Sequence, residues 1–253
     1  MRRDAAMPIY LSIAAPAYNE EEGIGTVIQY WHTFLKNQSD IAGFEIIICN
    51  DGSKDSTRSV LEKLHIIYPE LRCIHFQKNQ GAAAALSAAI AKTQYEWVLL
   101  MDSDDQFPIE NLPVMISCMR DTEAKAILGV RNKRDHLLAC LGSKLSGAVC
   151  NLVHGSRLKD FNSAFKLIYG SILRQLNLEA KGMNYSTEIT SRLLEVQVPL
   201  AEVNIDHRIR STGKSHIKLL KDSLHRLLFV GYLSWRQLLL KWQIIRRSND
   251  EGT

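Results

Sequence analysis

The chain has 253 residues, of which 46% are hydrophobic and 23% are charged, and its formal net charge is +4. This composition supports a full hydrophobic core and excludes a disordered or collagen-like chain. No run of about 18 uncharged apolar residues is present, so we expect no membrane-spanning helix. The five cysteines are scattered and none forms a C-x-x-C pair, which argues against a disulfide framework or a zinc knuckle and favours a reducing, cytoplasmic setting.

Short apolar runs alternate with helical patterns through the first half of the chain. This alternation predicts an α/β fold with a mostly parallel, Rossmann-like sheet and helices on both faces. Strands are expected at residues 9–14, 45–49, 71–76, 97–101 and 126–130. Helices are expected at residues 21–36, 56–68, 81–92 and 108–119. Asp55 is expected to cap the second of these helices.

The second half has a less regular pattern. Helices are expected at residues 137–153 and 187–196, and extended segments at residues 165–168 and 201–205. Apolar residues at helical spacing between 217 and 247 predict a C-terminal helical extension. Because no linker-like stretch separates the two halves, we expect one domain over residues 1–216, followed by an amphipathic, basic extension over residues 217–253.

Polar side chains gather where the first, second and fourth predicted strands end. The three clusters lie at residues 16–20, 50–57 and 102–106. In an open α/β sheet, ligands bind at the carboxyl ends of the strands. The second cluster contains Asp51-Gly52, which also suits a hairpin turn, but the helical pattern that follows favours a strand-to-helix loop. Gly52 permits a sharp backbone approach, and Asp51 is placed to accept hydrogen bonds from a base or ribose.

The third cluster contains the pair Asp102-x-Asp104. Residues i and i+2 of an extended or turn segment point the same way, so the two carboxylates converge just beyond an apolar strand. Hard divalent cations such as Mg²⁺ or Mn²⁺ take oxygen ligands and complete their shell with phosphate. A polar turn is the alternative for a lone D-x-D pair. The apolar run at 97–101 and the Gln106-x-Pro108 that follows favour a metal site.

Four motifs together carry a family resemblance: Pro-x-Tyr-Asn-Glu (16–20), x-Asp-Gly-Ser-x-Asp-x-Thr (50–57), Met-Asp-x-Asp-x-Gln-x-Pro (101–108) and Arg-x-x-Gly-x-Ser (210–215). In this order the chain resembles family 2 glycosyltransferases of GT-A fold and, among them, the dolichol-phosphate mannose synthase-like polyprenyl-phosphate glycosyltransferases. The resemblance implies a metal-dependent, inverting transfer of a hexose from a GDP- or UDP-sugar to a polyprenyl or dolichyl phosphate, in cell-envelope or glycolipid biosynthesis.

The resemblance also implies roles for individual residues. The nucleotide sugar would be framed by Pro16, Tyr18, Glu20, Asp51, Asp102 and Ser103. The Mg²⁺ or Mn²⁺ cofactor would be held by Asp102, Asp104 and Gln106. Asp104, Arg210 and Lys166 are the expected catalytic residues. The chain departs from the family pattern at Asn50, where an aspartate is frequent, at Lys166, where arginine is usual, and at His216, where many relatives carry lysine.

A phosphate acceptor is anionic near pH 7, so cations that position it matter more than a general base. We expect Arg131, Arg134, Arg210, Lys214 and Ser215 to bind the acceptor phosphate. Ten Lys or Arg residues lie between 207 and 247, against one acidic residue, which favours contact with an anionic lipid surface. A solvated helix face is the alternative. Glu188 could act as a base for a hydroxyl acceptor, but a helix N-terminal carboxylate is the preferred reading.

Two other functions remain open on the sequence: a soluble family 2 transferase acting on a saccharide or small-molecule hydroxyl, and an inactive nucleotide-sugar-binding scaffold. The intact Asp102/Asp104 pair counts against the scaffold. Expected partners are the nucleotide-sugar donor, the glycosyl acceptor and the cytoplasmic membrane face, with homo-oligomerisation left open and nucleic acid not expected. The sugar and the base remain unassigned.

Overall fold

The computed structural model describes residues 7–132, 137–180, 182–208, 228–237, 239 and 242, with the backbone alone over 137–143 and at 183. Its centre is a seven-stranded sheet in the order β3-β2-β1-β4-β6-β5-β7. The strands are β1 (Ile9–Ala17), β2 (Ile41–Asn50), β3 (Leu71–His75), β4 (Trp97–Leu100), β5 (Ala126–Arg131), β6 (Lys166–Tyr169) and β7 (Leu200–Ile205). β6 runs antiparallel to both of its neighbours, and the remaining pairs are parallel. The expected mostly parallel sheet is confirmed.

The helices also follow the expected order. They are α1 (Ile24–Lys36), α2 (Thr57–Ile67), α3 (Ala82–Ala91), α4 (Leu112–Thr122), α5 (Leu137–His154), α6 (Gly170–Gln175) and α7 (Tyr185–Glu195), with short 3-10 helices η1 (Ile109–Asn111) and η2 (Gly182–Asn184). The expected helix at 108–119 is thus divided between η1 and α4, and α6 was not expected. The residue at the N-cap of α2 is Ser56 and not Asp55. The Asp55 carboxylate nevertheless accepts a hydrogen bond from the Thr57 backbone N–H at 3.0 Å.

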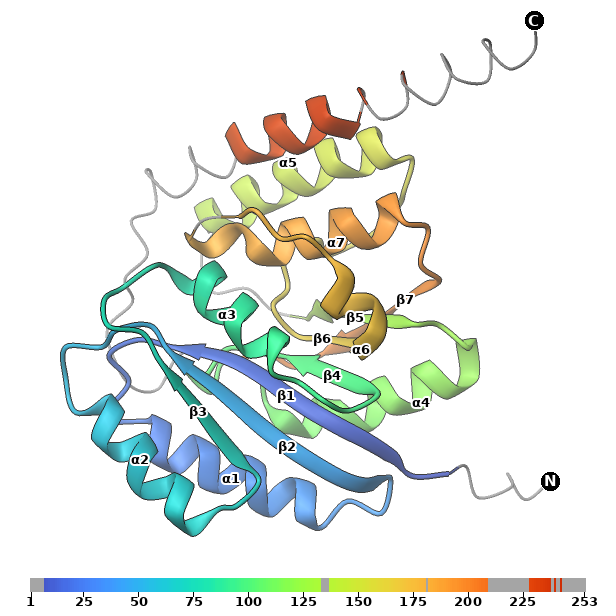
Figure 1. Cartoon of the computed structure of the whole chain (residues 1–253). Coiled ribbons are helices and arrows are strands. Elements are labelled where there is room, and N and C mark those ends of the chain that lie inside the picture. Colours follow the sequence, from blue (N-terminus) through green and yellow to red (C-terminus); the bar gives the residue numbers. More distant parts are fainter. Residues whose placement is uncertain are drawn as a thin grey trace, which may run out of the picture.

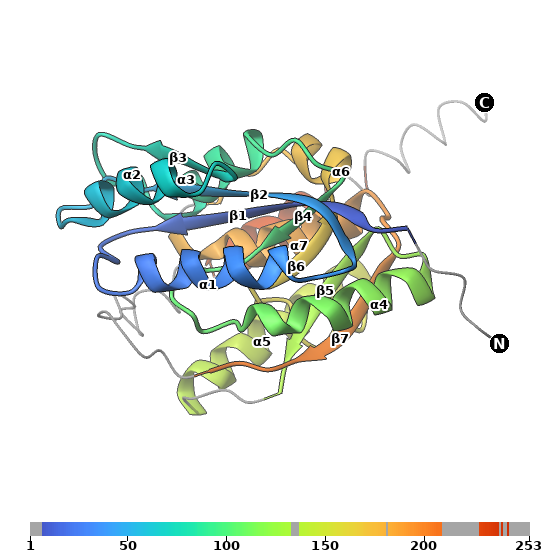
Figure 2. The ribbon, with the colours of Figure 1, turned by 90° about the horizontal axis from the view of Figure 1, so that it is seen from below.

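The helices cover both faces of the sheet. α1, α2 and α4 lie on one face, and α3, α6 and α7 lie on the other (Figures 1 and 2). The central strands β1, β2 and β4 are therefore buried on both sides, and side chains such as Leu11, Ile47 and Leu99 are fully inaccessible to solvent. Continuous apolar runs in these strands are the expected result of burial on both faces.

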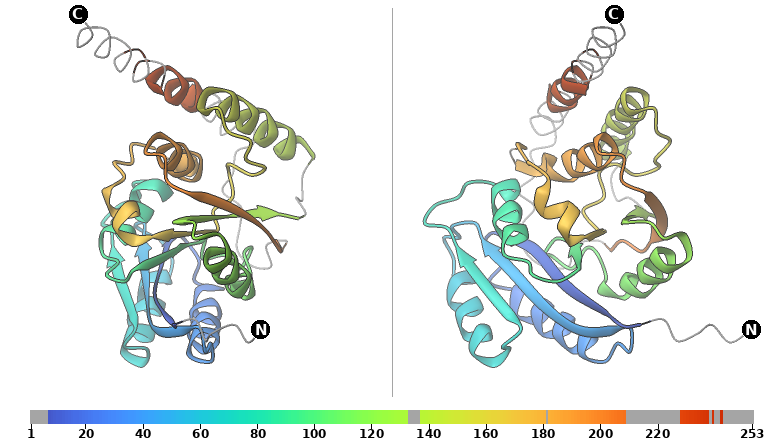
Figure 3. Two further views of the ribbon diagram at one scale, coloured as in Figure 1. Left: turned by 90° about the vertical axis from the view of Figure 1, so that its right-hand side faces the viewer. Right: turned by 45° about the vertical axis from the view of Figure 1, so that its right-hand side comes forward.

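A further layer lies outside α7. Figure 3 shows α5 beside the helical residues 228–237, which form part of the expected C-terminal extension. Cys150 of α5, Phe161 and Val230 form a small hydrophobic cluster that joins this layer to the body. Over the described ranges, none of the helices combines the length and the apolar character needed to cross a membrane.

Candidate functional site

The three motif loops meet at the carboxyl ends of β1, β2 and β4. Ala17 at the end of β1 is in register with Asn50 at the end of β2, and Ala14 is in register with Leu100 at the end of β4. The Ser103 hydroxyl donates a hydrogen bond of 2.8 Å to the Pro16 carbonyl, which joins the first loop to the third. The expectation that these polar clusters share one edge of the sheet is confirmed.

The loop after β4 carries the two aspartates in a half-buried position. The Tyr185 hydroxyl donates a hydrogen bond of 2.5 Å to Asp102 Oδ1. Asp104 Oδ1 accepts from the Gln106 backbone N–H at 3.2 Å. Asp105, at φ 59°, reverses the chain in the left-handed region, which Asp adopts more readily than most residues. The loop is a tight turn that presents carboxylates at the sheet edge.

The donor set of this loop suits a hard divalent cation. Asp102 and Asp104 offer carboxylate oxygens and Gln106 offers an amide oxygen, and Mg²⁺ is commonly bound by one or two carboxylates together with substrate phosphates. The residues that the structure describes contain no group of three or more His, Cys, Asp and Glu side chains arranged to hold a metal ion. Two carboxylates and one amide would leave coordination positions for a diphosphate to fill, and the assignment of Asp102, Asp104 and Gln106 to a cation stays a prediction.

Asp51 holds the loop that leads into α3. Its carboxylate is buried and accepts backbone hydrogen bonds from Gln80 N at 2.7 Å and from Gly81 N at 2.9 Å. Burial raises the pKa of Asp51, and these two N–H groups oppose the shift. Its expected role toward a base or ribose stays a prediction. Gly52 adopts φ +64°, and a Cβ there would lie 2.4 Å from the carbonyl carbon of Lys78.

The first and second motifs also bind each other. The backbone N–H of Glu20 donates to the Thr57 hydroxyl at 2.8 Å, and that of Asn19 donates to the Ser53 hydroxyl at 2.9 Å. Asn50 Oδ1 accepts from both the backbone and the hydroxyl of Ser53. Tyr18 is partly exposed beside this network. Much of the polar character of these motifs thus fixes the shape of the loops, and the predicted nucleotide contacts of Pro16, Tyr18 and Glu20 remain predictions.

Lys166 lies beneath the site. At the start of β6 it is in register with Leu100, two residues before Asp102. Its side chain is buried, and Nζ donates to the Ser163 carbonyl and, at 3.0 Å, to the Ser186 hydroxyl. Burial lowers the pKa of Lys166 to about 7. The sequence predicted a point charge directed at phosphate. The structure places the ammonium in the interior, and its catalytic role stays a prediction.

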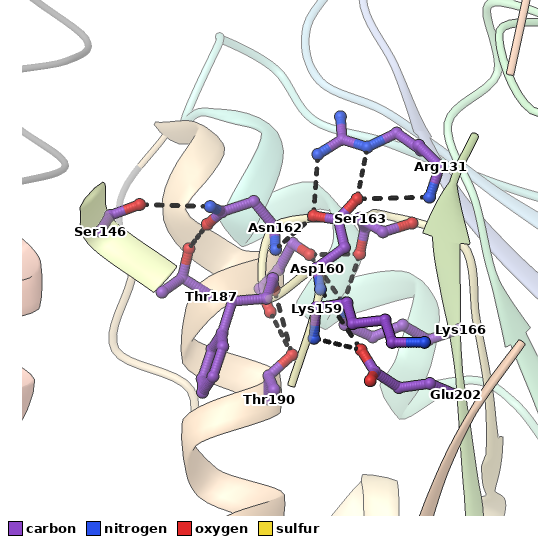
Figure 4. Close-up of polar contacts among 12 residues, drawn as sticks. Arg131, Ser146, Lys159, Asp160, Asn162, Ser163, Lys166, Thr187, Thr190 and Glu202 are labelled. Carbon is purple, nitrogen blue, oxygen red and sulfur yellow. Dashed lines mark hydrogen bonds and ion pairs between the residues drawn. The ribbon is translucent and has the colours of Figure 1, made fainter. Parts of the chain in front are cut away.

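Arg131 pairs with a buried carboxylate. Its Nε and Nη2 donate to the two carboxylate oxygens of Asp160 at 2.8 and 3.0 Å (Figure 4). The Asp160 side chain is fully buried and that of Arg131 is 18% exposed. Because this carboxylate already occupies the guanidinium, the predicted phosphate contact of Arg131 would have to be shared with Asp160. The other expected acceptor-phosphate residues, Arg134, Arg210, Lys214 and Ser215, lie outside the described residues.

The chain leaves β7 beside the carboxylate loop. The backbone N–H of Arg208 donates to the Gln106 carbonyl at 2.8 Å. The Arg208 guanidinium contacts Asp105 at 3.4 Å and Glu110 at 3.0 Å. The side chain of Asn111 binds both backbone groups of Asp206. The described chain therefore reaches position 208 next to the loop that holds Asp102 and Asp104.

Glu188 has a structural role. It lies in the first turn of α7, is fully buried, and accepts hydrogen bonds from the backbone N–H groups of Glu179 and Ala180 and from Arg192. The preferred reading of Glu188 as a helix N-terminal carboxylate is confirmed.

Tyr185 is the residue at this site that the sequence analysis missed. It is the first residue of α7, it is 3% exposed, and its hydroxyl contacts Asp102 from a position 83 residues away in the chain. Burial and the Asp102 carboxylate raise the pKa of its phenol well above 10, so the phenol remains a hydrogen-bond donor. A single tyrosine before a predicted helix carries no recognisable sequence signal.

Residues 12–137 match the model of glycosyl transferase family 2. The chain belongs to this family. The family 2 chain is 24% identical over 240 residues to the dodecaprenyl-phosphate galacturonate synthase of Rhizobium johnstonii and 26% identical over 259 residues to the dolichyl-phosphate beta-glucosyltransferase of Dictyostelium discoideum. These alignments cover 90% and 93% of this chain and 70% and 77% of the two relatives.

A third relative aligns with this chain over a shorter stretch. The family 2 chain is 31% identical to a dolichyl-phosphate beta-glucosyltransferase of Trichomonas vaginalis over 172 residues, which are 63% of this chain and 53% of that protein. The chain therefore spans about half the length of this relative.

The fold of the family 2 chain is also found in solved structures. Glucosyl-3-phosphoglycerate synthase from Mycobacterium tuberculosis superposes with a TM-score of 0.68 at 18% identity, covering 90% of this chain and 80% of that one. A crystal structure of the same synthase with Mn²⁺ and UDP-glucose superposes with a TM-score of 0.66 at 19% identity and covers 89% and 78% of the two chains. These likenesses confirm the GT-A fold that the resemblance implied.

Proposed function

We propose that this family 2 glycosyltransferase moves a sugar from a nucleotide diphosphosugar to a polyprenyl phosphate. The observation that carries the proposal is the similarity over 90% or more of the chain to two relatives named for transfer to dodecaprenyl and dolichyl phosphate. The similarity extends beyond residues 12–137, the range that the family model matches. It therefore includes the second half of the chain, which in our proposal receives the acceptor.

The donor would bind at the carboxyl ends of β1, β2 and β4. Asp102, Asp104 and Gln106 would hold Mg²⁺ or Mn²⁺, which would offset the negative charge that grows on the departing diphosphate. The glucosyl-3-phosphoglycerate synthase with bound Mn²⁺ and UDP-glucose supports this assignment through its shared fold. The hydrogen bond between Ser103 and Pro16 would hold the carboxylate loop in place beside the nucleotide loop.

The acceptor would attack the anomeric carbon directly and invert its configuration. A phosphate oxygen is already anionic near neutral pH, so the attack needs no proton transfer to a base. The buried state of Glu188 supports this choice, because the residue that the sequence singled out for a hydroxyl acceptor is bound to two backbone N–H groups and to Arg192. We assign Arg210, Lys214 and Ser215 to the acceptor phosphate on the sequence motif.

The helical residues after 227 offer a surface for the lipid. Leu228, Trp235, Leu239 and Trp242 follow one another at spacings of seven, four and three residues, and each is more than a third exposed. The opposite side packs on the body through buried Val230 and Leu233 and through Arg236, which pairs with Glu195 at 2.7 Å. An apolar stripe with tryptophans in a basic segment suits a helix that lies in a membrane interface.

The transfer assay uses the full-length protein with Mn²⁺, radiolabelled UDP- and GDP-sugars, and either polyprenyl phosphate or simple saccharides. Label entering the organic phase only when lipid phosphate is present supports the proposal. Transfer only to a water-soluble acceptor would reject it and would favour the soluble transferase. Asp104→Ala should lower transfer at least about 100-fold, whereas Asp121→Ala on the exposed end of α4 should leave it unchanged.

Membrane contact is tested by sedimentation with vesicles containing anionic lipid. Trp235→Asp should weaken binding about 10- to 150-fold, because burial of one large apolar side chain contributes about 1.5 to 3 kcal/mol. Ile66→Asp is the matched control, since Ile66 is 83% exposed on α2. Equal binding of both variants would remove the helical residues after 227 from the proposal.

A further inference from the structure

The first turn of α7 contacts two different parts of the site through three consecutive residues. Tyr185 donates to Asp102 in the carboxylate loop. The Ser186 hydroxyl accepts from Lys166 and donates to the Ser163 carbonyl at 2.5 Å. Thr187 donates to the side chain of Asn162, as Figure 4 shows. A single helical turn thus joins the loop after β4 to the segment that precedes β6.

The same junction also abuts the loop held by Asp51. A Cβ at Gly81 would lie 3.4 Å from the backbone nitrogen of Gly182. Gly182 is the first residue of η2, and η2 is followed directly by α7. Gly81 in turn donates its N–H to the Asp51 carboxylate. The segment from η2 into α7 is therefore packed against the loops that follow β3 and β4.

The hydrogen bond from Tyr185 constrains the direction of the Asp102 carboxylate. Tyr185 is 3% exposed within the main hydrophobic core, so its ring cannot swing away without disrupting packed neighbours. A donor fixed on Oδ1 sets the rotation of the carboxylate about its Cβ–Cγ bond and so sets where Oδ2 lies. Asp102 lies between the end of β4 and the bend at residues 103–107, so Tyr185 reaches it from a different element of the fold.

We propose that Tyr185 is a positioning residue that orients the Asp102 carboxylate for the divalent cation. The inference rests on the proposed function only in taking Asp102 as a metal ligand. Hydrogen-bonding partners of metal-binding carboxylates set ligand orientation, and their loss commonly weakens metal binding 10- to 100-fold.

The test measures Mn²⁺ binding by electron paramagnetic resonance, following the free-ion signal in the presence of UDP and, separately, of GDP. Tyr185→Phe keeps the ring and removes only the hydroxyl. It should weaken Mn²⁺ binding about 10- to 100-fold, and excess Mn²⁺ should restore transfer. The matched control is Tyr232→Phe, which also removes a hydroxyl that donates to a carboxylate, that of Glu179 at 2.6 Å, away from the motif loops.

The outcomes separate the two proposals. Wild-type Mn²⁺ affinity in Tyr185→Phe would overturn the role of Tyr185. An equal loss in both variants, tracking a fall in melting temperature, would also overturn it, because general loosening would then explain the effect. Mn²⁺ binding by the wild-type protein without transfer to lipid phosphate would instead overturn the proposed acceptor and leave the Tyr185 assignment standing. Failure of the wild-type protein to bind Mn²⁺ would overturn the metal site and this inference together.

Discussion

The two halves of the sheet stabilise their loops in different ways. In the half built from β1 to β4, motif side chains bind backbone N–H groups or hydroxyls of adjacent loops, as Asp51 does with Gln80 and Gly81. In the half built from β5 to β7 and its helices, two buried carboxylates bind arginine side chains in addition to backbone N–H groups. These are Asp160 with Arg131 and Glu188 with Arg192.

This difference explains why the structure of the first half is easier to predict from the sequence than that of the second. The bonds of the first half join short motifs that are visible in the chain, as between Glu20 and Thr57. The Arg131–Asp160 pair joins charges 29 residues apart that no such motif connects, and a charge buried without its partner is costly. A count of basic residues in the second half therefore overstates the cations available to a phosphate, because Arg131, Arg192 and Arg236 are all paired with carboxylates.

Breaking the Arg131–Asp160 pair should have the largest effect on stability. Asp160→Asn leaves a mostly buried guanidinium without its counter-charge, and we expect the free energy of unfolding to fall by about 3 to 5 kcal/mol in urea titrations. Asp40→Asn is the matched control, because the pair of Asp40 with Arg120 is 40% and 25% exposed and should contribute less than about 1 kcal/mol. Similar losses in the two variants would mean that burial of the pair is not what distinguishes this half.

The pH dependence of Lys166 sharpens the comparison, because this cation is buried without a directly bonded carboxylate among its hydrogen-bond partners in the described chain. Burial lowers its pKa from 10.5 to about 7, so between these values the unfolded chain binds more protons than the folded one. The contribution of Lys166 to the free energy of unfolding therefore rises with pH between the folded-state pKa of about 7 and the unfolded value of 10.5, and it is lowest below pH 7.

Lys166→Met removes this titration. Between pH 7 and 9, the free energy of unfolding of the wild-type protein should increase relative to that of the variant by up to about 1 kcal/mol per pH unit. Urea unfolding of both proteins at each pH gives the difference, in which the other titrating groups cancel. A difference that is constant with pH would show that Lys166 stays charged in the folded protein.

The smallest expected effect tests the tight loop after β2. Gly52→Ala and Gly155→Ala both place a side chain at positive φ, but the Cβ at position 52 meets the Lys78 and Asn79 backbone whereas that at position 155 has nothing within 4 Å. We expect Gly155→Ala to cost about 1 kcal/mol and Gly52→Ala roughly 1 kcal/mol more, because the backbone of the neighbouring loop must shift. Thermal and urea unfolding measure both. Equal costs in the two variants would show that the loop containing Gly52 and the loop containing Lys78 and Asn79 can move apart freely.

The limits of sequence prediction follow the same division. The strands at 9–14, 45–49 and 97–101 were predicted because they are continuous apolar runs. The structure extends the first at its C-terminal end to Ala17, extends the second at both ends, and ends the last at Leu100. The antiparallel direction of β6 and the short helix α6 were not predicted, because a four-residue strand carries no information about its direction. The interior position of Lys166 follows from the register of β6 with β4, which becomes visible only in the folded sheet.

The sequence by itself determined the order of the motifs, the placement of Asp102 and Asp104 just after an apolar strand, and the membership of family 2, because each depends on residues that are neighbours along the chain. The tertiary structure decided which charged groups face the site and which are neutralised inside the protein. Asp102 meets Tyr185 and Arg131 meets Asp160 across separations of 83 and 29 residues. Electrostatic and hydrogen-bond energies depend on distance through space, and folding alone sets that distance.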